Sequence, residues 1–301
     1  MGITIARLRA LSPLGPIFGK ELRSTARRRR TYVLRFLYLA ILLTIMLFFF
    51  TVATLNLRGQ SNSAVRQSQQ LAEMGAIFFA VFSFFTLSSM ALLGPVLTAT
   101  AINSERLHKT LAVLLMTPIT AWQIVAGKLF SRLLIALTLI GLTLPALSVV
   151  RLLGGIETGQ IVGALALSIS VVIAAAALGL LLSTLMNRAY SVILLSYGTM
   201  LIVYALTPMV IAMVMATLTR TSSGRGPPGY WFLMHFVNLT NPFFVMGTLV
   251  ATRGGMPFKL LSWEYCAAVH FAAAAALLLL CGFFLRRIAK KETDAHPHAP
   301  V

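Results

Sequence analysis

Charged residues are scarce in this sequence. Asp, Glu, Lys and Arg make up 11% of the 301 residues, whereas a soluble protein carries roughly 25%. Hydrophobic residues reach 58% and the mean hydropathy is +0.87. Several apolar runs exceed the ~20 residues that a helix needs to cross a ~30 Å hydrocarbon core. The composition therefore excludes an ordinary soluble domain and predicts a membrane protein that crosses the bilayer several times.

Acidic residues are the rarest charged class, with seven Asp and Glu against 25 Lys and Arg. The long apolar runs carry no Asp, Glu, Lys or Arg in their interiors. An ionisable residue at membrane depth costs about 2.5–3.5 kcal/mol and usually marks a functional site. Its absence argues against a proton- or sodium-coupled transporter with a carboxylate relay. His270, one turn into the last run, is the nearest exception, and we interpret it as an interfacial packing residue.

Cysteine is limited to Cys266 and Cys281, both in the last apolar run. On one helix they are about 22 Å apart, which excludes a disulfide between them. The sequence also has no glycine-rich nucleotide loop ending in Lys-Ser or Lys-Thr, no Gly-x-Ser-x-Gly motif and no metal-ligand spacing. We therefore expect no cofactor, metal or nucleotide on this chain and no catalytic activity of its own.

The apolar runs predict an all-α membrane protein with six transmembrane helices. With the amino terminus inside, 18 basic residues fall on the cytoplasmic side and seven outside, as the positive-inside rule requires. The basic excess is thus assigned to membrane anchoring and not to nucleic acid, and both termini are expected in the cytoplasm of a multi-pass cell-membrane protein. The predicted order is a basic leader with an interfacial helix, a domain of six spans and a tail. The leader covers 1–35, the membrane domain 36–285 with spans at about 36–57, 75–103, 131–150, 160–187, 189–219 and 265–285, and the tail 286–301.

The segment ERLHKTLAVLLMTPITAWQIVAGKLF, residues 105–130, is apolar enough to suggest a seventh span. A crossing there would leave 16 basic residues inside and nine outside, so charge alone does not decide. Pro118 cannot continue the preceding helix without losing a hydrogen bond, and Thr120 with Gln123 fits a capping box for a new helix that runs through Lys128 into the third span. The half before Pro118 is only about 18 Å long. The pattern predicts a short cytoplasmic helix between the second and third spans.

A second charge-free stretch, residues 226–252, is divided by Asn241 and Pro242. Asn is a favoured helix cap and Pro a favoured first helical residue. Each half spans only about 12–14 Å, less than half of the hydrocarbon core. This predicts a hairpin on the outer side between the fifth and sixth spans, either re-entrant or lying at the interface.

The 105–130 segment resembles the first cytoplasmic loop of the type 2 ATP-binding-cassette (ABC) exporter permeases. In that family a Glu is followed by a Gly-Thr-Leu-Glu run, a leucine-rich turn, Thr-Pro and a Gly-Lys that enters the third span. Lys109 and Ala112 stand where the family usually has Gly and the second Glu. The matching residues are Glu105, Thr110, Leu111, Leu114, Leu115, Thr117, Pro118, Gly127 and Lys128. The leader GPIFGKELRSTARRRR and the stretch NPFFVMGTLVA also resemble family segments, so the resemblance covers nearly the whole chain.

The resemblance implies a permease subunit whose ATP and Mg are held by a separate cassette ATPase. The short cytoplasmic helix would transmit the motion of that ATPase, and the Glu105 carboxylate is expected to bond an Arg or Lys of the partner. A second permease chain, either identical or a paralogue, would complete a path lined by the second and fifth spans. The candidate coupling residues are Glu105, Arg106, His108, Lys109, Leu111 and Leu114. The candidates for contact with an apolar or amphipathic substrate are Phe78, Phe79, Phe82, Phe85, Met209 and Met213, for which packing against core or lipid is the alternative.

Two other classes of function stay open beside the exporter. A non-transporting membrane module would couple a cassette ATPase to partners on the outer side, and the exterior segment 220–264 is long enough to contribute. An intramembrane enzyme would need a pair of reactive groups at membrane depth, which the apolar runs lack. Substrate flux into vesicles separates the first of these classes from an exporter.

Overall fold

The chain folds into helices, as the apolar runs predict. The structure, a computed structural model, describes residues 29–57, 64–103, 105, 121–154, 156–221, 230–251 and 263–295. Within these ranges all regular structure is helical. The helices are α3 (Arg29–Leu57), α4 (Ala64–Thr98), α7 (Ala121–Leu152), α8 (Thr158–Leu185), α9 (Ala189–Leu201), the π-helical turn η1 (Ile202–Leu206), α10 (Thr207–Thr221), α11 (Tyr230–Thr240), α12 (Pro242–Ala251) and α13 (Trp263–Ala295). The predicted all-α fold is confirmed, whereas the predicted interfacial helix in the leader lies outside the described residues.

Six of the described helical segments are long and apolar enough to cross a membrane, or seven if the bent pair α11–α12 counts as one span. They confirm the six predicted transmembrane helices. The third begins at Trp122 and not near residue 131, because α7 runs without a break through Lys128 and Arg132. The six segments are Thr31–Val52, Gln69–Thr98, Trp122–Leu152, Thr158–Leu185, Ala189–Leu218 and Trp263–Arg287.

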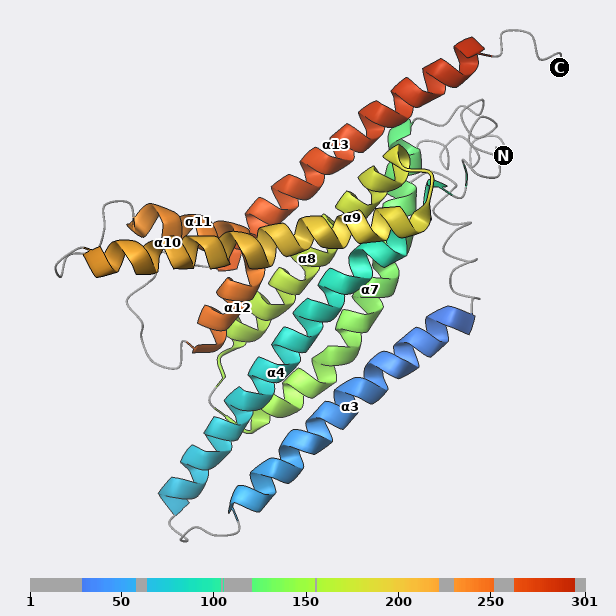
Figure 1. Cartoon of the computed structure of the whole chain (residues 1–301). Coiled ribbons are helices and arrows are strands. Elements are labelled where there is room, and N and C mark those ends of the chain that lie inside the picture. The colour runs from blue at the N-terminus through green and yellow to red at the C-terminus, as the bar shows by residue number, and fades with distance from the viewer. Residues whose placement is uncertain are drawn as a thin grey trace, which may run out of the picture.

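Helix α8 is the centre of the bundle. It packs along α4 and α13, with α7 on another side (Figure 1), and 67% of its most apolar stretch is buried. Small residues bring α4 and α8 together: a Cβ added to Gly94 would lie 2.6 Å from Ala175 Cβ, and one added to Gly179 would lie 2.4 Å from Thr98 Oγ1. In lipid, close backbone approach of this kind drives helix association because lipid tails are as apolar as the side chains.

Helix α3 lies at the edge of the bundle, beside α4 and α7 (Figure 1). Only 11% of its most apolar stretch is buried. Tyr38 and Leu42 are its buried hydrophobic side chains among those described, and the Tyr38 hydroxyl donates to Thr86 Oγ1 over 3.5 Å. The first span is therefore held by few contacts.

The fifth span crosses the bundle as a long rod made of α9, η1 and α10, strongly tilted against the other spans (Figure 1). None of its most apolar stretch is buried. Its π-helical turn places the Thr207 backbone N–H on the Ile202 carbonyl. Pro208 follows directly and has no N–H to offer the Tyr204 carbonyl four residues earlier. The interruption thus has a local cause in the sequence.

Helices α11 and α12 meet at an angle of 100°. Asn241 lies at the bend, where its Oδ1 accepts the backbone N–H groups of Phe243 at 2.9 Å and Phe244 at 3.2 Å. Pro242 is the first residue of α12. The predicted cap and helix start are confirmed, because both follow from chemistry local to the chain.

Candidate coupling site and transport groove

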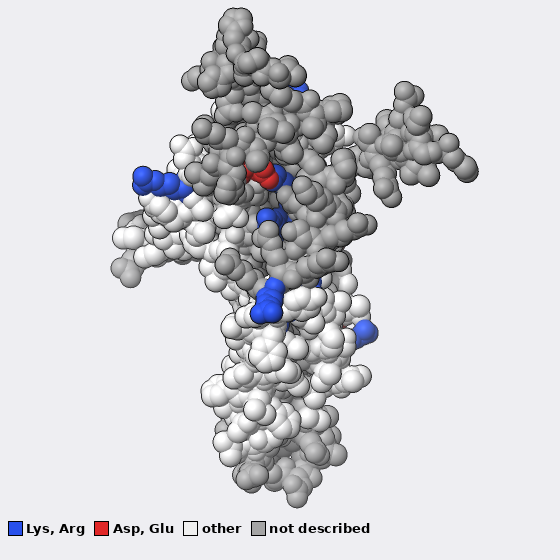
Figure 2. Space-filling model, turned by 90° about the vertical axis from the view of Figure 1, so that its right-hand side faces the viewer, with Lys and Arg blue, Asp and Glu red and all other residues white. Residues whose placement is uncertain are grey.

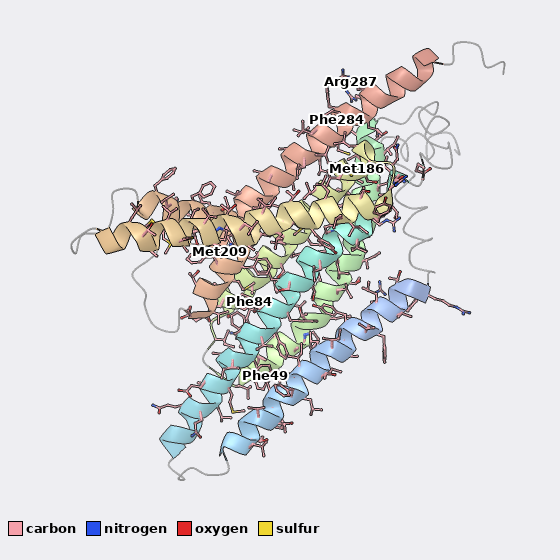
Figure 3. All side chains as sticks on the ribbon, viewed as in Figure 1. Phe49, Phe84, Met186, Met209, Phe284 and Arg287 are labelled. Carbon is pink, nitrogen blue, oxygen red and sulfur yellow. The ribbon has the colours of Figure 1, made fainter. Side chains whose placement is uncertain are left out.

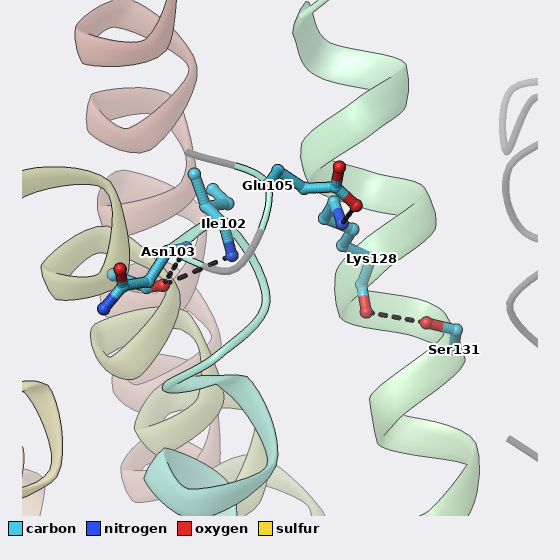
Figure 4. A network of polar contacts seen from close by, with 6 residues as sticks. Ile102, Asn103, Glu105, Lys128 and Ser131 are labelled. Carbon is cyan, nitrogen blue, oxygen red and sulfur yellow. Dashed lines mark hydrogen bonds and ion pairs between the residues drawn. The ribbon is translucent and has the colours of Figure 1, made fainter. Parts of the chain in front are cut away.

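The residues that follow the carboxyl end of α4 are hydrogen-bonded to one serine of α8. Ser183, buried in α8, donates its hydroxyl to the Ala99 carbonyl at 2.9 Å and accepts the backbone N–H groups of Ile102 at 3.3 Å and Asn103 at 3.2 Å (Figure 4). A hydroxyl has one proton to donate and two lone pairs to accept, so all of its bonding capacity is used here. The serine fixes the place where the chain leaves the second span.

An ion pair joins the next part of this segment to α7. Lys128 Nζ lies 3.1 Å from Glu105 Oε1, with 4% of the lysine side chain and 30% of the glutamate side chain exposed (Figure 4). A buried ammonium is strongly unfavourable without a partner. Glu105 thus compensates a cation in the amino-terminal part of α7, and the pair holds Glu105 against the third span.

Asn103 lies between these two contacts and is itself buried. Among the described residues, neither its amide nitrogen nor its amide oxygen finds a hydrogen-bond partner. An unsatisfied buried polar group costs about 1–3 kcal/mol. Burial of the Asn103 amide therefore lowers the stability of this turn. The contacts of Ser183 and Glu105 hold the turn in place despite that cost.

A groove of about 590 Å³ lies between α4 and the fifth span. Its volume is in the range of small-molecule sites. Tyr197 closes part of it by donating its hydroxyl to the Leu92 carbonyl at 2.5 Å. The lining residues are Ser88, Ala91, Leu92, Leu194, Tyr197, Gly198, Met200, Leu201, Tyr204, Ala205 and Phe243. The site offers aromatic and aliphatic surface with a few hydroxyl groups.

Tyr204 connects this groove to the bend between α11 and α12 and to α13. Its carbonyl, left without the Pro208 donor, accepts Asn241 Nδ2 at 2.9 Å. Its hydroxyl lies 3.0 Å from His270 Nε2, and His270 Nδ1 lies 2.8 Å from the Cys266 carbonyl. Because a carbonyl only accepts, Nδ1 carries the proton; in the neutral form of the ring, Nε2 is then the acceptor for the tyrosine hydroxyl. One groove residue is thus held both by the bend between α11 and α12 and by α13.

The sequence matches a known family of membrane proteins. A family model described as ABC-2 family transporter protein matches residues 16–287. The chain belongs to this family. A comparison with curated proteins finds no match. The protein is therefore a multi-pass membrane permease component of an ABC transporter, a transport component that is not itself catalytic, and the family as a whole works with cassette ATPases.

The structure describes only part of the predicted coupling site of this permease. Arg106, His108, Lys109, Leu111 and Leu114 lie outside the described residues. Glu105 is described, and its carboxylate pairs with Lys128 of the same chain. The sequence predicts a basic residue of a partner in that place. The Gly-Lys at the start of the third span fits the family pattern, but nothing in the sequence identified its lysine as the partner of Glu105.

The aromatic residues predicted for the permease's substrate path do not share one surface. Phe78 and Phe82 are buried in the core with their rings stacked 6.2 Å apart. Phe85 packs on Tyr38 of α3 with ring centroids 5.2 Å apart. Phe79 is also buried. In this structure these rings pack within the chain, in keeping with the packing alternative.

The two predicted methionines lie elsewhere. Met209 and Met213 are 67% and 68% exposed on α10 (Figure 3 labels Met209). The structure does not bring them together with the phenylalanines. The groove residues Tyr197, Tyr204 and Phe243 were not predicted from the sequence, although the Asn241–Pro242 pair marks one of the elements that meet there.

Proposed function

We propose that this chain is the transmembrane subunit of an ABC exporter, in which a separate cassette ATPase hydrolyses ATP and two permease chains move the substrate. Family membership supports the transport role, and the Glu105–Lys128 ion pair carries the coupling role. The protein lies in the cell membrane with both termini in the cytoplasm, since this orientation puts 18 of 25 basic residues inside.

The segment that follows α4 is the element that the ATPase moves. Ser183 ties its start to α8, and Glu105 ties it to α7. A displacement of this segment is therefore transmitted to α4, α7 and α8 together. Glu105 acts as a positioning residue, and the surface for the ATPase comes from residues further along: Arg106, His108, Lys109, Leu111 and Leu114.

The groove between α4 and the fifth span supports an apolar or amphipathic substrate. Tyr204 and Phe243 offer ring faces to the apolar part of such a molecule, and the Ser88 hydroxyl is a polar group near it. Met209 and Met213 on the exposed face of α10 are placed to meet either the substrate or a second permease chain, identical or a paralogue. The aromatic side chains of α4 stabilise the helices around this path by packing.

The charge reversal Glu105→Lys tests the coupling role. It sets two cations side by side, so the segment separates from α7. The tagged variant is expected to insert and to co-purify with its ATPase, while ATP-driven uptake of a fluorescent amphipathic dye into inside-out vesicles falls at least about tenfold. The double variant Glu105→Lys with Lys128→Glu restores an ion pair of opposite polarity and is expected to recover part of the uptake. Glu264→Lys, at the exposed start of α13, is the matched control and is expected to transport normally.

The results of these experiments distinguish between the hypotheses. Normal uptake by Glu105→Lys would contradict the coupling role. A wild-type chain that stimulates its ATPase and moves no dye or other amphipath would favour the non-transporting module that acts on outer-side partners.

A further inference from the structure

A second groove, of about 570 Å³, runs between α3 and α4. It exists because α3 touches α4 through few side chains, chiefly Tyr38 against Phe85 and Thr86. Along α3 the lining side chains extend from Arg29 to Ile41, about 18 Å of helix. The remaining lining is Val33, Leu34, Leu37 and Tyr38 on α3, with Phe85, Ser89, Leu92 and Leu93 on α4.

The walls of this groove are almost entirely aliphatic or aromatic, and one end carries a cation. Arg29 is exposed and belongs to the lining. No acidic side chain pairs with it within the described part of the chain, in contrast to Lys128, which has Glu105. The groove thus combines a long apolar surface with an exposed guanidinium at one end.

We propose that this groove binds an anionic glycerophospholipid, with an acyl chain along the α3–α4 walls and the phosphate on Arg29. A guanidinium forms strong charge-assisted hydrogen bonds with phosphate oxygens, and basic residues at the ends of spans attract anionic lipids. Val33 and Leu37 at the open side are 60% and 54% exposed, so the groove is reached from the lipid and not from water. The lipid would hold the loosely packed first span against the second.

A second copy of this chain fits the groove less well. Its partner for Arg29 would have to be acidic, and the chain has only seven acidic residues against 25 basic ones. Among the described residues on the face shown in Figure 2, Lys and Arg also cover more of the surface than Asp and Glu. Charge complementarity therefore favours an anionic lipid.

The test uses the purified full-length chain, delipidated in detergent. Palmitoyl-oleoyl phosphatidylglycerol or the phosphatidylcholine with the same acyl chains is added, and bound lipid is counted by native mass spectrometry. The wild type is expected to retain the anionic lipid about fivefold better, since one basic residue near the membrane surface contributes roughly that factor. Arg29→Ala is expected to remove this preference. Arg287→Ala, at the far end of α13 (Figure 3), is the control and is expected to keep it.

A second variant tests the apolar part of the site. Leu37→Trp fills the groove and leaves Arg29 in place, so it is expected to lower the binding of both lipids several-fold, with an unchanged gel-filtration profile. Equal retention of the two lipids by the wild type, an equal loss in Arg29→Ala and Arg287→Ala, or unaltered binding in Leu37→Trp would overturn the proposal. So would disulfide-linked dimers formed in native membranes through a cysteine placed at position 33, because a second copy would then cover the groove.

Discussion

The Nε2 atom of His270 lies 3.0 Å from the hydroxyl of Tyr204, and this contact ties the last span to the π-helical turn of the fifth. The same tyrosine lines the groove between α4 and α9, and its carbonyl is bound by Asn241 at the bend between α11 and α12. A strongly tilted span with little burial is thus connected to the bundle by polar contacts at its interruption. These contacts are accessible to mutation one at a time.

Tyr204→Phe removes the hydroxyl and keeps the ring. Polar contacts between spans contribute about 0.6 kcal/mol on average and up to about 1.7 kcal/mol, so we expect a loss of this size in thermal unfolding of the purified protein. His270→Ala should cost more, because it leaves the tyrosine hydroxyl without an acceptor and opens a cavity. Tyr265→Phe is the control, since Tyr265 is exposed on α13. Equal shifts in Tm for Tyr204→Phe and Tyr265→Phe would show that the contact does not stabilise the fold.

Asn241→Ala removes both functions of the residue at the bend. The α12 cap and the bond to the Tyr204 carbonyl are lost together, and we expect a destabilisation of about 2 kcal/mol. Asn241→Ser retains a hydroxyl that caps a helix, and it is expected to lie between the wild type and the alanine variant. Urea or heat unfolding followed by circular dichroism measures this order, and a serine variant no better than alanine would contradict the capping role.

Asn238→Leu is not expected to destabilise the protein, in contrast to Asn241→Ala. Asn238 is buried in α11, and its amide nitrogen and amide oxygen have no hydrogen-bond partner in the part of the chain that the structure describes. Replacing an unsatisfied polar group with an apolar one of similar shape is neutral or stabilising. A Tm equal to or above that of the wild type is the expected result. A clear drop in Tm would mean that Asn238 has a polar partner in the protein as isolated.

The positions of the spans and the bend at Asn241 follow from local properties of the chain. A run of apolar residues long enough to cross the bilayer has few alternatives to a helix. The Asn-Pro pair likewise sets a cap and a helix start through atoms only a few residues apart. These features were predicted from the sequence for that reason.

Local properties of the chain do not predict which face of each span packs against other helices. Lipid tails are as apolar as leucine. The same apolar residue types therefore occur at positions buried between helices and at positions that face lipid. Phe82 and Met209 therefore look alike in the sequence, although the first is fully buried and the second is 67% exposed. The ion pair of Glu105 and Lys128 also depends on how the turn after α4 lies against α7, which spacing along the chain does not reveal.

Gly179→Ala tests the close approach of α4 and α8. An added Cβ would lie 2.4 Å from Thr98 Oγ1 and 3.0 Å from Pro95 Cα, so the helices must separate. Overpacking of this kind typically costs about 1–3 kcal/mol. Gly141→Ala in α7 is the matched control, because a Cβ there meets nothing within 4 Å and alanine favours a helix by about 0.5–1 kcal/mol. The two variants should shift Tm in opposite directions, and a shared direction would contradict the packing argument.

Ser183→Ala separates coupling from folding. It removes the bonds to Ala99, Ile102 and Asn103 that hold the turn after α4 on α8. Ser170→Ala on the same helix is the control, since Ser170 is equally buried and its hydroxyl donates to Leu167 within its own helix. If the turn transmits the ATPase motion, Ser183→Ala should lower dye uptake per ATP hydrolysed by about fivefold or more, while the amount of inserted protein stays close to that of Ser170→Ala. An unchanged uptake per ATP would show that the turn can move on α8 without loss, and the coupling route would then have to run through Glu105 and α7 alone.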